Sequence, residues 1–149
     1  MSTYALVESV RRTLLADAGV KKIVGSRVFP SFPDIDASVK DGQWPILTVM
    51  IGGGSKIVPR HESDTRGENI LVIESIHSKD DKKKLTDLHA RVLDQVKPRI
   101  VNQFAQQGTD LKITVALMRL DNEEDVGFDQ ETDTYRFRAQ YGVKFVMRN

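Results

Sequence analysis

The apolar residues near the start of the chain recur at spacings of three and four, which predicts an amphipathic helix from Thr3 to Asp17. Gly19 is an expected stop for this helix. The residues Val20 to Val24 form a short apolar segment, and Gly25 breaks the pattern again. We therefore expect one N-terminal helix that is followed by an irregular, partly apolar connection.

A second stripe with helical spacing predicts a long helix after an N-cap at Ser78 or Asp80, with an acid in its first turn. Gly108 is the expected end of this helix. Pro98 lies inside the stripe and should kink or split the helix, because proline lacks a backbone donor and clashes with the preceding turn.

Runs of β-prone residues predict the strands. Arg27 to Pro30 favours a short edge strand that ends at proline. The run Ile46 to Ile51 is continuously β-prone, which indicates either a core strand buried on both faces or a strand at a subunit contact. Glu68 to His77 is the next strand, and we expect it to pair antiparallel with the previous one. Leu111 to Leu120 is the third long strand, with Leu111, Ile113, Val115 and Leu117 on one face.

The last segment gives the clearest period of two. Apolar residues alternate with mostly basic ones from Tyr135 to Met147, which predicts a long strand with a core face and a basic outer face. The basic row consists of Arg136, Arg138, Lys144 and Arg148.

Three polar segments separate these elements. Ser31 to Gln43 indicates a long exposed connection, and Gly52 to Gly67 indicates a long hairpin arm that carries Arg60 and Arg66. Asp121 to Asp133 predicts an acidic turn region, which contains Glu123, Glu124 and Asp125.

The order of the elements predicts an α+β fold. The simplest packing is a four-stranded antiparallel or mixed sheet, with the N-terminal helix and the long, proline-interrupted helix on one face. We expect a single domain over residues 1–149, since one core is sufficient for a chain of this length. The other face of the sheet is then solvated or docked.

Composition narrows the possible functions. The chain has no cysteine, so it has neither a disulfide framework nor a thiolate metal site. The 22 basic and 21 acidic residues give a net charge of +1, which provides no overall attraction for nucleic acid. We expect no membrane role, because neither a signal peptide nor a membrane-spanning apolar run is present.

No motif indicates a catalytic residue, a cofactor site or a metal site. Gly52 to Lys56 lacks the order of a phosphate-binding loop. The start of the acidic region has calcium-loop spacing, yet Val126 and Thr132 occupy the positions of the glycine and the terminal acid. A metal-dependent nuclease would rest on Glu74 alone within a strand. We therefore predict a protein that is not an enzyme.

The three histidines are not paired at metal-ligand spacing, and we read His61, His77 and His89 as exposed to solvent.

Two motifs and the order of the elements resemble the tail-terminator, or tail-completion, family of tailed bacteriophages. The segment Gly25 to Pro30 is similar to the family's pattern of glycine, any residue, arginine, aliphatic, aromatic and proline. Trp44 to Val49 resembles its proline-led first strand. The succession of strand pair, long helix and final strand pair extends the resemblance over nearly the whole chain, whereas Pro98 and the long polar segments depart from it.

This resemblance implies a structural virion protein that forms a ring, commonly hexameric. The ring caps the head-proximal end of the tail tube, stops its polymerisation and provides the head-tail joining surface. The implied partners are further copies of the chain, the tail tube protein and a head-completion or connector protein, and DNA passes through the channel without specific binding. The implied location is the neck of the virion, after assembly in the host cytoplasm.

The residue pattern suggests where such a ring would make contact. Our first hypothesis is that the basic row or the segment from Arg60 to Arg66 meets Glu123, Glu124 and Asp125 of the adjacent subunit. The second is that the acidic region lines the channel. The alternatives are another phage neck or head-completion protein, or a small nucleic-acid-binding module whose basic row meets phosphates.

Overall fold

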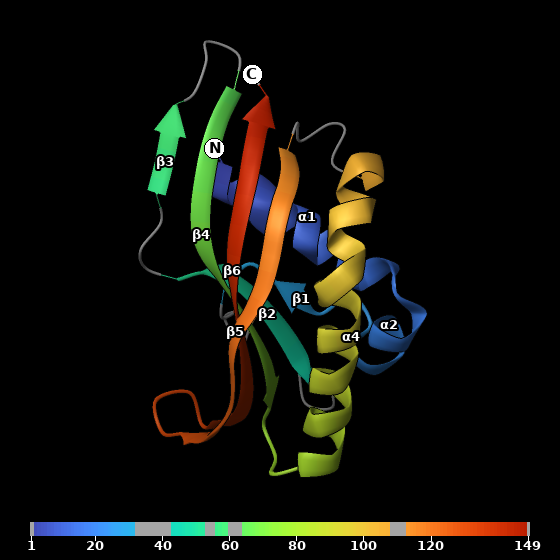
Figure 1. Ribbon diagram of the computed structural model, residues 1–149. Helices are drawn as coiled ribbons and strands as arrows, with labels where there is room; N and C mark the ends of the chain where they lie inside the picture. Colours follow the sequence, from blue (N-terminus) through green and yellow to red (C-terminus); the bar gives the residue numbers. More distant parts are fainter. Residues whose placement is uncertain (1, 32–42, 53–55, 60–63, 108–112, 149) are drawn as a thin grey trace.

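Along the described residues of the computed structural model, two helices precede four strands, and a long helix then precedes two more strands, an order that confirms the α+β class (Figure 1). The structure describes residues 2–31, 43–52, 56–59, 64–107 and 113–148. Its helices are α1 (Ser2–Ala16), α2 (Ala18–Val24) and α4 (Lys82–Gln107). Its strands are β1 (Val28–Phe29), β2 (Ile46–Ile51), β3 (Lys56–Pro59), β4 (Asp64–His77), β5 (Ile113–Asp129) and β6 (Thr134–Arg148).

The strands form one mixed sheet of six strands, where the sequence predicted four. The order is β1-β2-β4-β6-β5, and β3 pairs with the first part of β4. Only β1 and β2 are parallel among these pairs, and β2 and β4 are antiparallel as predicted. The expected arm from Gly52 to Gly67 therefore contributes paired backbone to the sheet through β3 and the start of β4.

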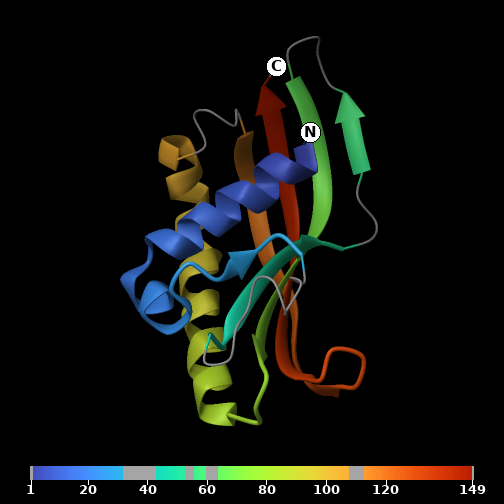
Figure 2. The same ribbon diagram turned by 180° about the vertical axis from the view of Figure 1, so that it is seen from behind.

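The main core lies between one face of the sheet and the helices, as predicted. Leu6, Val10 and Leu14 of α1 join Leu88 and Val92 of α4 and the buried side chains of the central strands. Figure 2 shows α1 crossing this face of the sheet, which we call the helix face. Neither view shows a helix of the described residues over the opposite, outer face.

A second, smaller core explains why β2 is buried on both faces. Ile46 of β2 and Ile76 of β4 are opposite one another, and Phe29 and Trp44 pack against them. Ile73 of β4 and Val49 of β2 belong instead to the main core. Burial of β2 on both faces is thus confirmed.

The helix boundaries correct three expectations. Gly19 lies inside α2, because Asp17 ends the first helix and caps the second by accepting a hydrogen bond from Val20 N at 2.8 Å. Asp81 caps α4, since its carboxylate accepts from Lys84 N at 3.1 Å, and the first turn carries no acid. Helix α4 continues past Pro98 without splitting, because losing one hydrogen bond leaves the flanking turns of a 26-residue helix intact. The expected end at Gly108 lies outside the described residues, as does most of the connection from Ser31 to Gln43.

The largest correction concerns the acidic region. Strand β5 continues to Asp129 and pairs with β6 as far as Thr134, so most of the predicted turn is a strand. The register shifts past Ala116, Asp121 and Val126, as expected of β-bulges. The shift at Ala116 also breaks the alternation predicted from Leu111 to Leu117. Gly127, with φ of 77°, directly follows the third shift and adopts a conformation that favours glycine.

Candidate functional site

The two faces of the β5–β6 hairpin receive charged residues alternately, because successive side chains of a strand point to opposite sides of the sheet. Arg136 is opposite Ile76 and Arg138 is opposite Glu74, so both arginines lie on the outer face. The register of β5 adds Glu124 to the same face as Arg138. The sheet thus brings together charged residues that lie 62 and 64 positions apart in the sequence.

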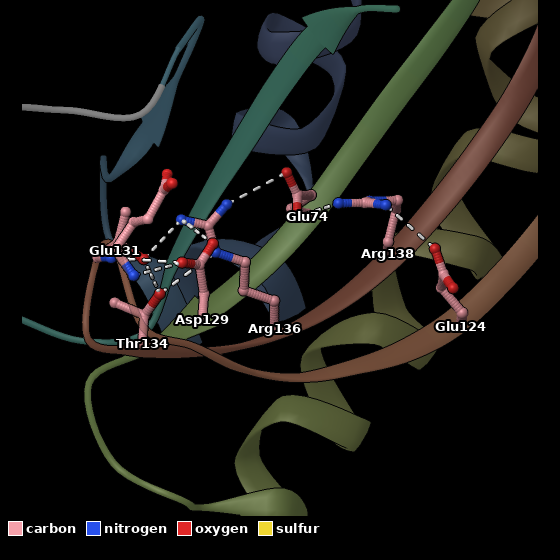
Figure 3. A network of polar contacts seen from close by, with 8 residues as sticks. Glu74, Glu124, Asp129, Glu131, Thr134, Arg136 and Arg138 are labelled. Atoms are coloured by element: carbon pink, nitrogen blue, oxygen red, sulfur yellow. Dashed lines mark hydrogen bonds and ion pairs between the residues drawn. The ribbon is translucent and has the colours of Figure 1, made fainter.

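These residues form an outer-face charge network around Glu74 (Figure 3). Arg136 Nη1 is 3.5 Å from Glu74 Oε1, and Arg138 Nη2 is 3.5 Å from Glu74 Oε2. Arg138 Nη1 donates to Glu124 at 3.1 Å, and Arg136 Nη2 is 3.7 Å from Asp129. The Glu74 side chain is only 4% exposed. This carboxylate is therefore buried between two guanidinium groups.

The β5–β6 turn also holds Arg136. The guanidinium donates through Nε to Thr134 at 3.2 Å and through Nη2 to Thr132 at 2.9 Å. These contacts fix the arginine that occupies one side of the Glu74 carboxylate. Three acids and two arginines give the network a net charge of −1, so it does not form a row of cations for phosphate binding.

The structure gives fewer side-chain contacts for the remaining residues of the basic row and for the arginines of the segment from Gly52 to Gly67. Lys144 lies 3.5 Å from Glu68, with both side chains more than half exposed. The backbone of Arg148 in β6 pairs with Asp64, and the backbone of Arg66 in β4 pairs with Val146. The side chains of both arginines lie outside the described part of the structure. Arg60 lies outside the described residues altogether.

The helix face of the same hairpin carries Glu123 and Asp125 in a different setting. Glu123 is opposite Ala139 and Asp125 is opposite Phe137, which places both acids beside α4. His89 Nε2 of α4 is 4.0 Å from Glu123, and its ring meets Phe137 edge-on with centroids 5.6 Å apart. Asp125 accepts a hydrogen bond from Gly127 N at 2.9 Å, and no basic side chain in the described structure forms an ion pair with it.

Two adjoining cavities of about 260 and 120 Å³ lie between α4 and this face, and Phe137 and Asp125 line both. We call the pair of cavities the hairpin groove. Its further lining includes Asp80, Lys82, Leu85, Thr86, His89, Glu123, Phe128 and Tyr135. The groove therefore has an aromatic floor and a largely acidic rim.

Burial sets the protonation of the groups around this face. Burial lowers the pKa of His89, and the nearby carboxylate of Glu123 only partly opposes it. Burial also lowers the pKa of His77, whose Nδ1 accepts a hydrogen bond from Lys79 N at 2.9 Å. Both rings are thus neutral at pH 7. The expectation of exposed histidines is wrong for His77, which is buried, and for His89, which is half-buried, while His61 lies outside the described residues.

Sequence reasoning missed the partners of the charged residues. In the sequence, Glu74 is a lone acid within an apolar strand. This was the available signal of a buried ion pair, because a buried acid requires a paired charge. Phe128 is the exposed large hydrophobic side chain of the described structure and packs on Tyr135 with ring centroids 5.1 Å apart. It lay in a segment that was expected to be a turn.

The described residues provide neither a metal-binding cluster nor a membrane-spanning helix. No group of three or more histidine, cysteine, aspartate or glutamate side chains is arranged there to hold a metal ion. None of the described helices combines the length and apolar character needed to cross a bilayer.

Comparison with known proteins finds similarity at the level of the fold. No family model and no curated protein matches the sequence. Among solved structures, a chain described as "Virion of native gene transfer agent (GTA) particle" superposes with a TM-score of 0.66 and 15% sequence identity. The match covers 96% of this chain and 96% of that chain, so the two share a fold along nearly their whole lengths.

Proposed function

We propose that this chain is a structural, non-enzymatic virion protein that forms a ring at the head-proximal end of a phage tail tube. The ring, which we expect to be hexameric, stops polymerisation of the tube and provides the surface for head-tail joining. The observation that carries the proposal is the shared fold, over 96% of both chains, with a component of a gene transfer agent virion. The resemblance of Gly25 to Pro30 and of Trp44 to Val49 to tail-terminator segments supports the specific role.

The distribution of charge is compatible with this role. A ring contact between identical subunits joins two different patches of the same chain, so each subunit must present complementary surfaces. The chain carries 22 basic and 21 acidic residues, and the acids in the described lining of the hairpin groove outnumber its lysine, Lys82. The outer-face arginines are paired with carboxylates, which argues against a nucleic-acid-binding module.

The first test is the native mass of the purified protein by light scattering over a wide concentration range, with negative-stain imaging of any large species. We expect closed rings with six times the mass of the 16.8 kDa chain. A monomer at every concentration that also fails to bind purified tail tubes would contradict the proposal.

Two further measurements separate the related roles. Binding to one end of the tail tube and shortening of tubes assembled in its presence distinguish a terminator from another neck or head-completion protein. DNA affinity measured as a function of salt distinguishes both from a nucleic-acid-binding module, which would lose affinity steeply as salt increases.

A further inference from the structure

The hairpin groove combines features that suit a protein partner. Its floor is aromatic at Phe137, and Phe128 at one end is 48% exposed. Its rim carries the carboxylates of Asp80, Glu123 and Asp125. An exposed aromatic side chain beside an apolar floor favours a partner's apolar side chain, and the acidic rim favours a cationic one.

The electrostatics of the groove are not balanced within the chain. Four acids line the groove, and one of them, Glu124, directs its carboxylate to Arg138 on the outer face. The other three carboxylates face the ammonium of Lys82, the cation of the lining, which leaves a net charge of −2 while His89 is neutral. This contrasts with the outer-face network, where each acid has a guanidinium within 4.0 Å. A basic partner would therefore relieve repulsion that the described side chains leave in place.

Helix α2 presents a complementary surface elsewhere on the same chain. Lys21 and Lys22 occupy its last turn and are both exposed, and Ile23 beside them is half-buried. The end of the helix is fixed, because Gly25 N donates to Lys21 O at 2.7 Å and Gly25 has φ of 62°. The backbone that carries the two adjacent lysines is thus held in a defined conformation.

The groove and α2 lie on different sides of α4. Lys82, Thr86 and His89 line the groove, whereas Asp87, Ala90 and Arg91 line a cavity that includes Ile23 of α2. At about 100° per residue, the centres of these two sets of positions are roughly 130° apart around the helix axis. A subunit with complementary patches on different sides can bind one neighbour through each, which is the condition for a closed ring.

We propose that the end of α2 in one copy of the chain docks into the hairpin groove of the next copy. Lys21 and Lys22 meet the carboxylates of Glu123 and Asp125, and their aliphatic stems contact the aromatic floor. This contact rests on the proposed ring and identifies the two patches that close it.

Cross-linking tests the contact directly, because the chain has no cysteine of its own. The variant that carries Lys22→Cys and Asp125→Cys, treated with a short bis-maleimide, should give a ladder of covalent oligomers. The matched control combines Lys22→Cys with Asn122→Cys, because Asn122 is exposed on the same strand but belongs to the outer face. The control and each single-cysteine variant should give no ladder. Rings without cross-links between positions 22 and 125, or equal ladders for the test and control pairs, would overturn the contact and leave the ring itself intact.

A charge exchange gives a second readout. Lys21→Glu with Lys22→Glu should weaken self-association about tenfold or more, and Glu123→Lys with Asp125→Lys should do the same. Combining all four substitutions should restore assembly, since the opposite charges then face one another again. Failure of the combination to restore rings, while each variant retains the thermal stability of the parent, would overturn the pairing. A parent protein that is monomeric and gives no cross-link at any concentration would remove both the contact and self-driven ring formation.

Discussion

The acidic residues of strand β5 fall on two faces of one hairpin and meet opposite surroundings. On the outer face, Glu124 reaches Arg138, which also contacts the buried Glu74. On the helix face, Glu123 has the neutral ring of His89 at 4.0 Å as its ion-pair candidate among the described residues, and Asp125 accepts from the Gly127 amide of its own strand. Neighbouring acids in one sequence run thus serve different purposes, which depend on the residues across the sheet.

The difference separates charges that hold the fold from charges that remain for a partner. A buried carboxylate is tolerated only when opposite charges and hydrogen bonds compensate for its loss of water, and Glu74 has two arginines for this. Exposed carboxylates keep their water and need no partner within the chain. We therefore expect substitutions on the outer face to change stability and substitutions on the helix face to change association.

The largest effect is expected at Glu74. Glu74→Gln keeps the shape of the side chain but removes the buried carboxylate charge that lies between Arg136 and Arg138. We expect the free energy of unfolding to fall by about 3 kcal/mol, as when one partner of a buried ion pair is removed. Urea denaturation followed by circular dichroism measures the change.

Glu124→Gln is the matched control for Glu74→Gln. The Glu124 side chain is 46% exposed and contacts the same Arg138, yet its loss should cost less than about 1 kcal/mol because water screens the pair. Equal losses in the two variants would contradict the view that burial of Glu74 makes the network structural.

The sequence predicted the parts of this comparison that depend on local periodicity. The alternation from Tyr135 to Met147 placed Arg136 and Arg138 on the outer face, and the apolar run of β2 indicated a strand buried on both sides. Both follow from side-chain patterns within one segment.

The parts that failed depend on contacts between segments. Strand β5 was predicted to end near Leu120, because the acids that follow it are uncommon in strands, and pairing with β6 overrides this preference. The Glu74 network could not be predicted, since it depends on which residue of β6 is opposite Glu74, and the bulges in β5 hide its register. The sequence suggested an ion pair of Arg138 with Glu124 of the adjacent subunit, and the structure has this ion pair within one chain. The hypothesis that other residues of the basic row, or the segment from Arg60 to Arg66, contact acids of the adjacent subunit stays a prediction.

A smaller effect should appear on acidification, and it should act through His77 and His89. The folded-state pKa values of His77 and His89 lie below the unfolded value, so the unfolded chain binds more protons as pH decreases from about 6.5. The stability is fully present above that pH and is lost as pH falls toward the folded values.

Unfolding free energies measured between about pH 7.5 and pH 5.5 test this, because most carboxylates remain ionised over that range. His89→Gln should reduce the slope of stability against pH, and His89→Gln with His77→Gln should reduce it further. A slope that is unchanged in the double variant would show that other groups cause it.

The smallest effect on stability is expected for the acids of the helix face, and it completes the contrast. Glu123→Gln with Asp125→Asn removes two negative charges from a rim that has a net charge of −2. The repulsion between the carboxylates decreases, but their favourable hydration is lost, and these two effects on stability oppose one another. We expect the unfolding free energy to change by no more than about 0.5 kcal/mol, as for most surface substitutions. Self-association measured by light scattering should nevertheless weaken, because Lys21 and Lys22 of the next copy lose their counter-charges. A large loss of stability would place these acids with Glu74 among the residues that hold the fold. An unchanged association would mean that another part of the surface closes the ring.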